Sequence, residues 1–200
     1  MKPVSTRLLF EFEGGRALAL GHDDMSALQA FYVRNPEYFM AVEGEPPAAD
    51  EARSTLEDGL PPEMPYRYIR TIGFVDMDGA LTAMANVVAD MFVPGVWLIG
   101  LFIVQTDRHG HGLAQASYRA METWMRSEGA QWIRLGVVIG NARAERFWER
   151  VGYVEVRTRE GLVMKSKTND LRVMVKPLVE ESIAAYLAKV PRDRPETEGA

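Results

Sequence analysis

The chain has 200 residues, of which 47% are hydrophobic and 26% are charged, and it contains no cysteine. This composition is typical of a globular domain and excludes wholesale disorder, and the absence of thiols excludes disulfide scaffolds, thiolate metal sites and cysteine nucleophiles. No run of about 18 apolar residues is present and the first residues lack a signal-peptide core, so we expect no membrane span and a cytoplasmic location. The length predicts a single domain over residues 1–190, and we expect the polar, proline-containing end, residues 191–200, to be disordered.

Charge is distributed unevenly along the chain. Residues 1–100 carry 7 Lys and Arg against 15 Asp and Glu, a net charge of −8, whereas residues 101–200 carry 16 against 13, a net charge of +3. Because no basic stripe is concentrated in one place, the pattern argues against nucleic-acid binding. It fits a basic half for an anionic ligand and an acidic half for a cation, and it also fits ordinary solvation of the surface.

The first half of the chain combines short strands, helices and a meander. The expected strands are 8–12, 16–20, 68–75, 81–92 and 96–104, and the expected helices are 24–34, 37–42 and 50–57. Asn35-Pro36 ends the first helix. Asp76 to Gly79 and Pro94-Gly95 are hairpin signals, so the last three of these strands are predicted to be consecutive and antiparallel.

The second half alternates helices and strands. Its expected elements are a helix over 112–128, a buried strand over 133–139, a helix over 141–151, strands over 153–158 and 171–175, and a helix over 179–190. This order predicts an α/β fold with a mixed, mostly antiparallel sheet and helices on both faces.

The segment 104–114 joins a buried strand to a helix through Gly110 and Gly112. Glycines let a ligand approach the backbone, and the free N–H groups of a first helical turn attract anions, so this junction predicts an anion-binding loop. Arg108, His109 and His111 add positive charge around it. The alternative is an ordinary glycine-rich turn that packs a helix against a strand.

Two common nucleotide-binding motifs are missing. The chain has no G-x-x-x-x-G-K-[ST] sequence, which excludes a P-loop NTPase. The third glycine of the dinucleotide fingerprint is absent after Gly110 and Gly112, which argues against a Rossmann site.

A second motif follows the next predicted strand. This motif resembles the pattern N-x-x-A-x-x-F-Y-x-x-x-G-F, at the positions of Asn141, Ala144, Phe147, Trp148, Gly152 and Tyr153. The glycine-containing segment before it resembles a second pattern, Q/R-x-x-G-x-G/A, over residues His109 to Ala114. With both motifs in this order, the chain resembles the GNAT superfamily of acetyl-coenzyme A-dependent N-acyltransferases over roughly residues 68–177. The implied fold is the mixed sheet described above.

The resemblance implies that acetyl-CoA is the co-substrate. In the family, the loop amides hold the pyrophosphate, and the strand that ends at Val104 separates from its neighbour so that pantetheine can pair with it. The residues implied to bind the coenzyme are Phe102, Ile103, Val104, Arg108, His109, Gly110, His111, Gly112, Leu113, Ala114, Asn141, Ala144, Phe147 and Trp148. No metal is expected, because the three histidines are scattered without a carboxylate cluster.

The implied reaction is direct attack of an amine on the thioester, without a covalent enzyme intermediate. A backbone N–H near Phe102 or Val104 would polarise the thioester carbonyl. For the general base, the candidates are Asp90, Glu37 and Tyr38.

Two positions depart from the family pattern. His109 stands where the family has Gln or Arg, and Arg108 is a candidate to compensate for it. Trp148 replaces the tyrosine that protonates the leaving thiolate, and an indole N–H is not an acid at neutral pH. The proton then comes from solvent or from a hydroxyl, with Tyr118, Ser117 and Tyr153 as candidates.

The charge split predicts a cationic amine acceptor, either a small molecule or a peptide, and no nucleic-acid or membrane partner. A homodimer, if one forms, is expected to use the last helix and the final strands. Two alternatives stay open, a CoA-binding module without transferase activity and a structural or regulatory protein that uses the fold as an interface.

Overall fold

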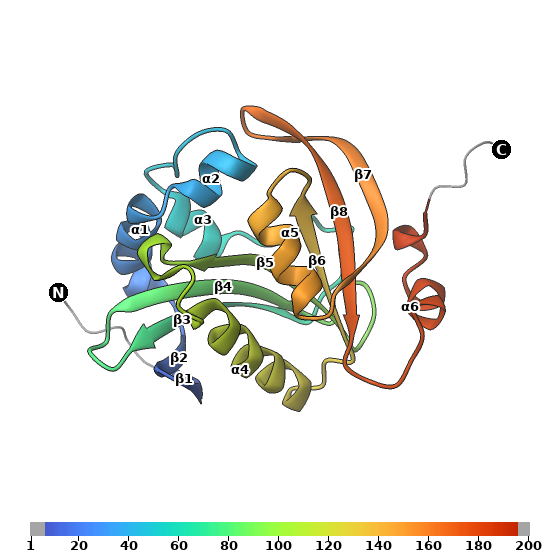
Figure 1. Cartoon of the computed structure of the whole chain (residues 1–200), viewed down its shortest axis with the longest axis horizontal. Helices are drawn as coiled ribbons and strands as arrows, with labels where there is room; N and C mark the ends of the chain where they lie inside the picture. Colours follow the sequence, from blue (N-terminus) through green and yellow to red (C-terminus); the bar gives the residue numbers. More distant parts are fainter. Residues whose placement is uncertain (1–6, 196–200) are drawn as a thin grey trace.

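The computed structural model describes residues 7–195, which form one eight-stranded sheet in the order β1-β2-β3-β4-β5-β6-β8-β7 (Figure 1). All neighbouring strands are antiparallel except β5 and β6, which are parallel. The predicted mixed, mostly antiparallel sheet with helices is therefore confirmed. No helix of residues 7–195 is long and apolar enough to cross a membrane.

The elements follow the expected order closely. They are β1 (Arg7–Phe12), β2 (Gly15–Ala19), η1 (His22–Asp24), α1 (Met25–Arg34), α2 (Glu37–Val42), α3 (Glu51–Glu57), β3 (Tyr68–Asp76), β4 (Leu81–Ala89), β5 (Val96–Val104), η2 (Thr106–Arg108), α4 (Leu113–Ser127), β6 (Trp132–Val138), α5 (Ala142–Arg150), β7 (Val154–Met164), β8 (Lys167–Pro177), α6 (Ile183–Lys189) and η3 (Pro191–Asp193).

Alternation along the strands gives the sheet two apolar faces. On one face, Trp97 and Ile99 of β5 share a core with Met121 and Trp124 of α4. Figure 1 shows α4 and α5 lying across this side of the sheet. On the opposite face, residues such as Ile103 pack with α1, α2 and α3. The helices thus cover both faces, because central strands such as β3 and β4 contribute buried side chains in both directions.

The C-terminal helix α6 packs farther along the sheet. Its Tyr186 lies in a core with Trp132 of β6 and Val173 of β8. The helix begins at Ile183, later than the predicted start at residue 179, because Ser182 caps it by accepting a hydrogen bond from the Ala185 N–H at 3.2 Å.

The predicted disorder of residues 191–200 is wrong for residues 191–195. They include η3, and the Asp193 side chain there is fully buried. Its carboxylate accepts hydrogen bonds from Arg134 Nε at 2.7 Å and Nη2 at 2.9 Å, and from the Tyr186 hydroxyl at 2.6 Å. A buried ion pair, rather than an apolar anchor, holds this end. Residues 1–6 and 196–200 lie outside the described residues, and with them the rest of the disorder prediction.

The strands β7 and β8 are longer than predicted. The sequence places them over 153–158 and 171–175, whereas each has 11 residues in the structure. Many side chains of β7 are exposed, and exposed positions do not have to be apolar. The apolar alternation that predicts a strand is therefore missing from part of β7. The additional length carries the β7–β8 turn to the α2–α3 segment.

Candidate active site

The strands β5 and β6 separate partway along their length. They pair only from Val96–Trp132 to Ile99–Leu135, so beyond Ile99 no strand of residues 7–195 pairs with the edge of β5 that faces β6. Gly100 has no register partner on β4 either and forms a bulge, which bends the strand. The separation leaves backbone groups of β5 available to an extended ligand, as the family resemblance implies.

A cleft of about 1300 Å³ lies at this separation. The predicted site residues that line it are Phe102, Ile103, Val104, His109, Gly110, Gly112, Ala114, Asn141, Ala144, Phe147 and Trp148. Arg108, His111 and Leu113 are not among its lining residues, although they lie in the same loop and first turn. The structure thus brings the two sequence motifs together on one cleft.

The glycine loop (residues 109–114) presents open backbone to the cleft. Gly110 has φ +83° and Gly112, the N-cap of α4, has φ +82°, which are left-handed conformations that favour glycine. A Cβ at either position would meet no atom within 4 Å, so a ligand can approach both. The 15-residue helix α4 starts directly behind, and its free N–H groups and dipole favour an anion here.

The helix α5 adds positive charge to the opposite wall. Its N-cap Asn141 accepts a hydrogen bond from the Ala144 N–H at 3.3 Å. Arg143, Arg146 and Arg150 also line the cleft, and the sequence analysis missed them. They occupy variable positions of the second motif, and their spacing of three and four residues, which places them on one helix face, was the signal that could have found them.

His109 links the two walls. Its Nε2 lies 2.9 Å from the Val104 carbonyl oxygen, and its Nδ1 faces Nη1 of Arg143 within hydrogen-bond distance. Because arginine only donates, Nδ1 accepts and Nε2–H donates to Val104, so the ring is the neutral tautomer. A guanidinium from α5 therefore stands beside the position where the family has Gln or Arg.

Two of the three candidate bases line the cleft on the α2 side. Glu37 accepts a hydrogen bond from the Thr106 hydroxyl at 2.6 Å, and this bond lowers the pKa of Glu37, with the charge of Arg143 acting in the same direction. Glu37 is thus an ionised carboxylate and a weak base. Burial raises the pKa of Tyr38, so its phenol stays protonated and is no base.

The structure does not bring Asp90 to the cleft. Asp90 lies in the β4–β5 turn with φ 53°, its carboxylate 2.9 Å from Arg67 Nε and 2.7 Å from the Gly95 N–H that donates to it. It supports the turn, so we do not retain it as a general base. The strand pattern predicted β4 to continue through residue 92, which placed Asp90 inside the strand.

The candidate acids are also buried away from the cleft. Burial raises the pKa of Tyr118 far above its ordinary value, and its hydroxyl is engaged with Glu122 and with Tyr153 at 3.2 Å. Burial raises the pKa of Tyr153 as well. Ser117 is fully buried, and its hydroxyl finds no hydrogen-bond partner within residues 7–195. None of the three lines the cleft.

Trp148 serves as an aromatic part of the cleft wall. Its ring centroid lies 5.8 Å from Phe102, 5.5 Å from Tyr118 and 5.2 Å from Tyr153. Only 7% of Trp148 is exposed, so its position is fixed by packing. The residue shapes the cleft without offering an acid.

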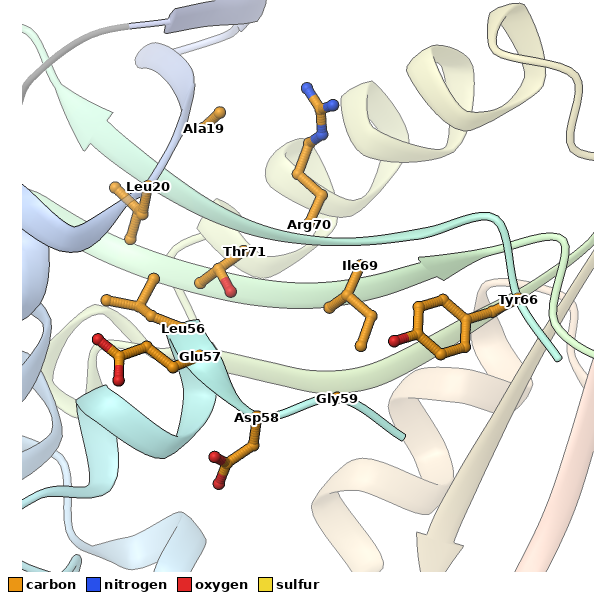
Figure 2. A pocket seen from close by; sticks show the side chains of 10 residues that line it. All are labelled: Ala19, Leu20, Leu56, Glu57, Asp58, Gly59, Tyr66, Ile69, Arg70 and Thr71. Atoms are coloured by element: carbon orange, nitrogen blue, oxygen red, sulfur yellow. The ribbon is translucent and has the colours of Figure 1, made fainter. Parts of the chain in front are cut away.

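A second, smaller pocket of about 380 Å³ lies between α3 and β3 (Figure 2). Figure 2 shows the carboxylates of Glu57 and Asp58 on one side of β3 and the guanidinium of Arg70 on the other. None of the predicted site residues borders this pocket. Within residues 7–195, no group of three or more His, Asp or Glu side chains is placed to hold a metal ion.

Comparisons with known proteins agree with this geometry. The sequence profile of the Acetyltransferase (GNAT) family matches residues 27–153, while no curated protein matches the chain. The structure is similar to an acetyltransferase from Thermus thermophilus, with a TM-score of 0.64 and 18% identity over 86% of this chain and 100% of that one. A GCN5-related N-acetyltransferase from Kribbella flavida has a TM-score of 0.61 and 26% identity over 83% of this chain and 99% of that one.

A third similar structure is spermidine N-acetyltransferase from Vibrio cholerae in complex with CoA and spermine. Its TM-score is 0.60 at 17% identity, over 80% of this chain and 94% of that one. The family profile spans more than half of the chain and includes both motifs that meet at the cleft. The chain belongs to the acetyltransferase (GNAT) family.

Proposed function

We propose that the chain transfers an acetyl group from acetyl-CoA to an amine acceptor. The observation that carries this proposal is the separation of β5 from β6 at the point where the glycine loop opens onto the cleft. Open backbone at Gly110 and Gly112 fits a pyrophosphate, and the unpaired edge of β5 fits an amide-containing arm. Arg143 and Arg146 supply the positive charge that a polyphosphate requires.

In the proposed reaction, the amine nitrogen forms a bond with the acetyl carbonyl carbon, and the bond from that carbon to sulfur breaks. A backbone N–H between Phe102 and Val104 stabilises the carbonyl oxygen as it gains charge. The amine gives its proton to water or to a base. The thiolate leaves as an anion and takes a proton from water, because the nearby tyrosines Tyr118 and Tyr153 hold theirs too tightly.

A second candidate function is CoA binding without transfer. The observation in its favour is Trp148, which stands in place of the expected tyrosine and has no acidic proton. Thiol release that depends on an added amine distinguishes the two, since only a transferase produces it.

Replacing Arg143 with Ala should weaken CoA binding about tenfold to a hundredfold, the effect of losing one charged hydrogen bond of about 1.5–3 kcal/mol. Calorimetric titration with CoA measures the change. In the Arg143→Ala background, His109→Arg should restore affinity by returning a guanidinium to the loop. Arg119→Ala, an exposed α4 residue outside the cleft, is the control. An unchanged Kd for Arg143→Ala would contradict the assignment.

Replacing Trp148 with Phe should reduce turnover less than about tenfold, because the ring contributes packing and not a proton. Replacing it with Tyr should preserve or raise turnover. Steady-state thiol release with saturating acetyl-CoA is the measurement. A loss of about a thousandfold or more in a folded Phe variant would show that the indole acts chemically.

The acceptor is expected to be a cationic amine. The supporting observations are the net charge of −8 over residues 1–100 and the ionised Glu37 carboxylate in the cleft wall. An amine panel assayed at low and high ionic strength tests this, since salt screens the attraction of an acidic surface for a cation. Cationic amines should react faster, with rates that fall as salt rises and that rise with pH as the amine loses its proton. Preference for neutral or acidic acceptors without salt dependence would contradict it.

A further inference from the structure

The turn between β7 and β8 is fastened to the segment that joins α2 to α3. Figure 1 shows the joined end of β7 and β8 beside α2. We call this contact the clasp; it consists of Ala41, Val42, Glu43, Gly44 and Glu51 on one side and Lys165, Ser166, Lys167 and Asn169 on the other. The residues of the two sides are more than a hundred positions apart in sequence.

One part of the clasp is ionic. Lys165 Nζ contacts the Glu43 carboxylate and lies 2.7 Å from Glu51 Oε2. All three side chains are at most one-third exposed. Although burial by itself lowers the pKa of Lys165, its hydrogen bonds to the two carboxylates raise it on balance, so the amine stays charged and the pairs stay intact at neutral pH.

The other part binds backbone. Ser166 donates from its N–H at 3.2 Å and from its hydroxyl at 3.0 Å to the Glu43 carbonyl. Lys167 Nζ donates to the Ala41 carbonyl at 2.6 Å, and Asn169 Nδ2 donates to the Val42 carbonyl at 2.7 Å. These bonds use carbonyls at the end of α2 that the helix itself leaves without partners. Opening the clasp therefore breaks the hydrogen bonds of these three carbonyl groups and of their donors at the same time.

The backbones also approach closely. Gly44 has φ +80°, and a Cβ there would lie 2.8 Å from Ser166 Oγ and 3.1 Å from Lys167 Cβ. A side chain at position 44 would push the two sides apart. Because glycine has no side chain, the β7–β8 turn can pack directly against the α2–α3 segment.

Both sides of the clasp belong to the cleft wall. On the α2 side, the cleft is lined by Ala41, Val42 and Glu43. On the β7–β8 side, it is lined by Met164, Lys165 and Leu171. In the proposed function, CoA takes the side formed by the glycine loop and α5. The acceptor then approaches from the α2 side, where the clasp joins the two walls.

We propose that the clasp restricts the acceptor to a small amine and excludes a peptide chain. This inference rests on the proposed function and narrows its acceptor class. A small amine passes between walls that are joined at this end, whereas a peptide held across the cleft needs the space that the clasp fills. Admitting a peptide requires breaking both the ionic and the backbone parts.

The test compares a short linear diamine with a short peptide that carries a free amino terminus and one lysine. Measured as kcat/KM with acetyl-CoA, the wild-type chain should acetylate the diamine and leave the peptide at background. Gly44→Val and Lys165→Ala, which open the clasp by steric pressure and by loss of the ion pairs, should raise the ratio of peptide to diamine kcat/KM by about tenfold or more. Lys189→Ala, which removes an ion pair between the last residue of the remote helix α6 and Glu181 just before that helix, should leave the ratio unchanged.

Calorimetric titration with CoA and circular dichroism on each variant verify that the coenzyme side and the fold are intact. A wild-type chain that acetylates the peptide as efficiently as the diamine would overturn the clasp proposal and leave the proposed function standing. So would folded variants with an unchanged ratio. Absence of transfer to any amine would overturn the proposed function, and the acceptor class with it.

Discussion

Replacing Gly112 with Val is expected to weaken CoA binding by about a hundredfold or more. The valine side chain would enter the open space in front of the glycine loop, where backbone amides are proposed to contact the pyrophosphate. Losing two charged hydrogen bonds of about 1.5 kcal/mol each is sufficient for this effect. Calorimetric titration with CoA is the measurement.

Gly79 offers a matched control for this substitution. It has the same φ of +82°, and a Cβ there also meets no atom within 4 Å, but it lies in the β3–β4 turn away from the cleft. Gly79→Val should therefore suffer the same backbone strain, about 1–2 kcal/mol, and retain CoA binding. Equal affinities of the two folded variants would show that the glycine loop is not the pyrophosphate site.

Replacing Asp193 with Ala should lower the free energy of unfolding by about 3–5 kcal/mol. The substitution leaves the buried Arg134 guanidinium without its carboxylate, and it also removes the acceptor of the Tyr186 hydroxyl. Urea unfolding measures the change. Glu57→Ala, which breaks an exposed pair with His22, should change stability by less than about 1 kcal/mol. A comparably small effect at Asp193 would mean that the C-terminal end is not held by this pair.

The same carboxylate predicts a dependence of stability on pH. Burial by itself raises the pKa of Asp193, but the hydrogen bonds and charge of Arg134 outweigh it and lower the pKa below its ordinary value. A carboxyl whose pKa is lower in the folded state stabilises the fold above its unfolded pKa of about 3.9, and this contribution is lost as the pH falls through the folded value. Asp193→Asn should remove that part of the acid dependence in unfolding experiments.

Local signals predicted the fold well, and many of the site residues that they singled out line one cleft. The hairpin glycines, the apolar runs and the Asn141 cap each act within a few residues, so the sequence displays them directly. Gly110 and Gly112 have left-handed backbone conformations, which favour glycine. The order of the strands then follows from short connections.

The features that sequence reasoning missed depend on pairs far apart in the chain. Arg134 and Asp193 are 59 positions apart, and a polar tail gives no sign that one of its carboxylates has a buried partner. Arg143 of α5 contacts His109 of the glycine loop, 34 positions earlier in the chain. The clasp joins Lys165 to Glu51 across 114 positions, through strands whose exposed side chains lack an apolar pattern. Such contacts are set by packing of whole elements, which local periodicity does not encode.

The most direct test of acetyl transfer follows the acetyl group itself. The wild-type chain is incubated with acetyl-CoA labelled on the acetyl carbons and with a short linear diamine, and the products are separated by mass. The proposed function predicts label on the amine nitrogen of the acceptor, with one free thiol formed for each labelled product. Label that remains on CoA, or that appears only as free acetate regardless of the amine, would contradict it.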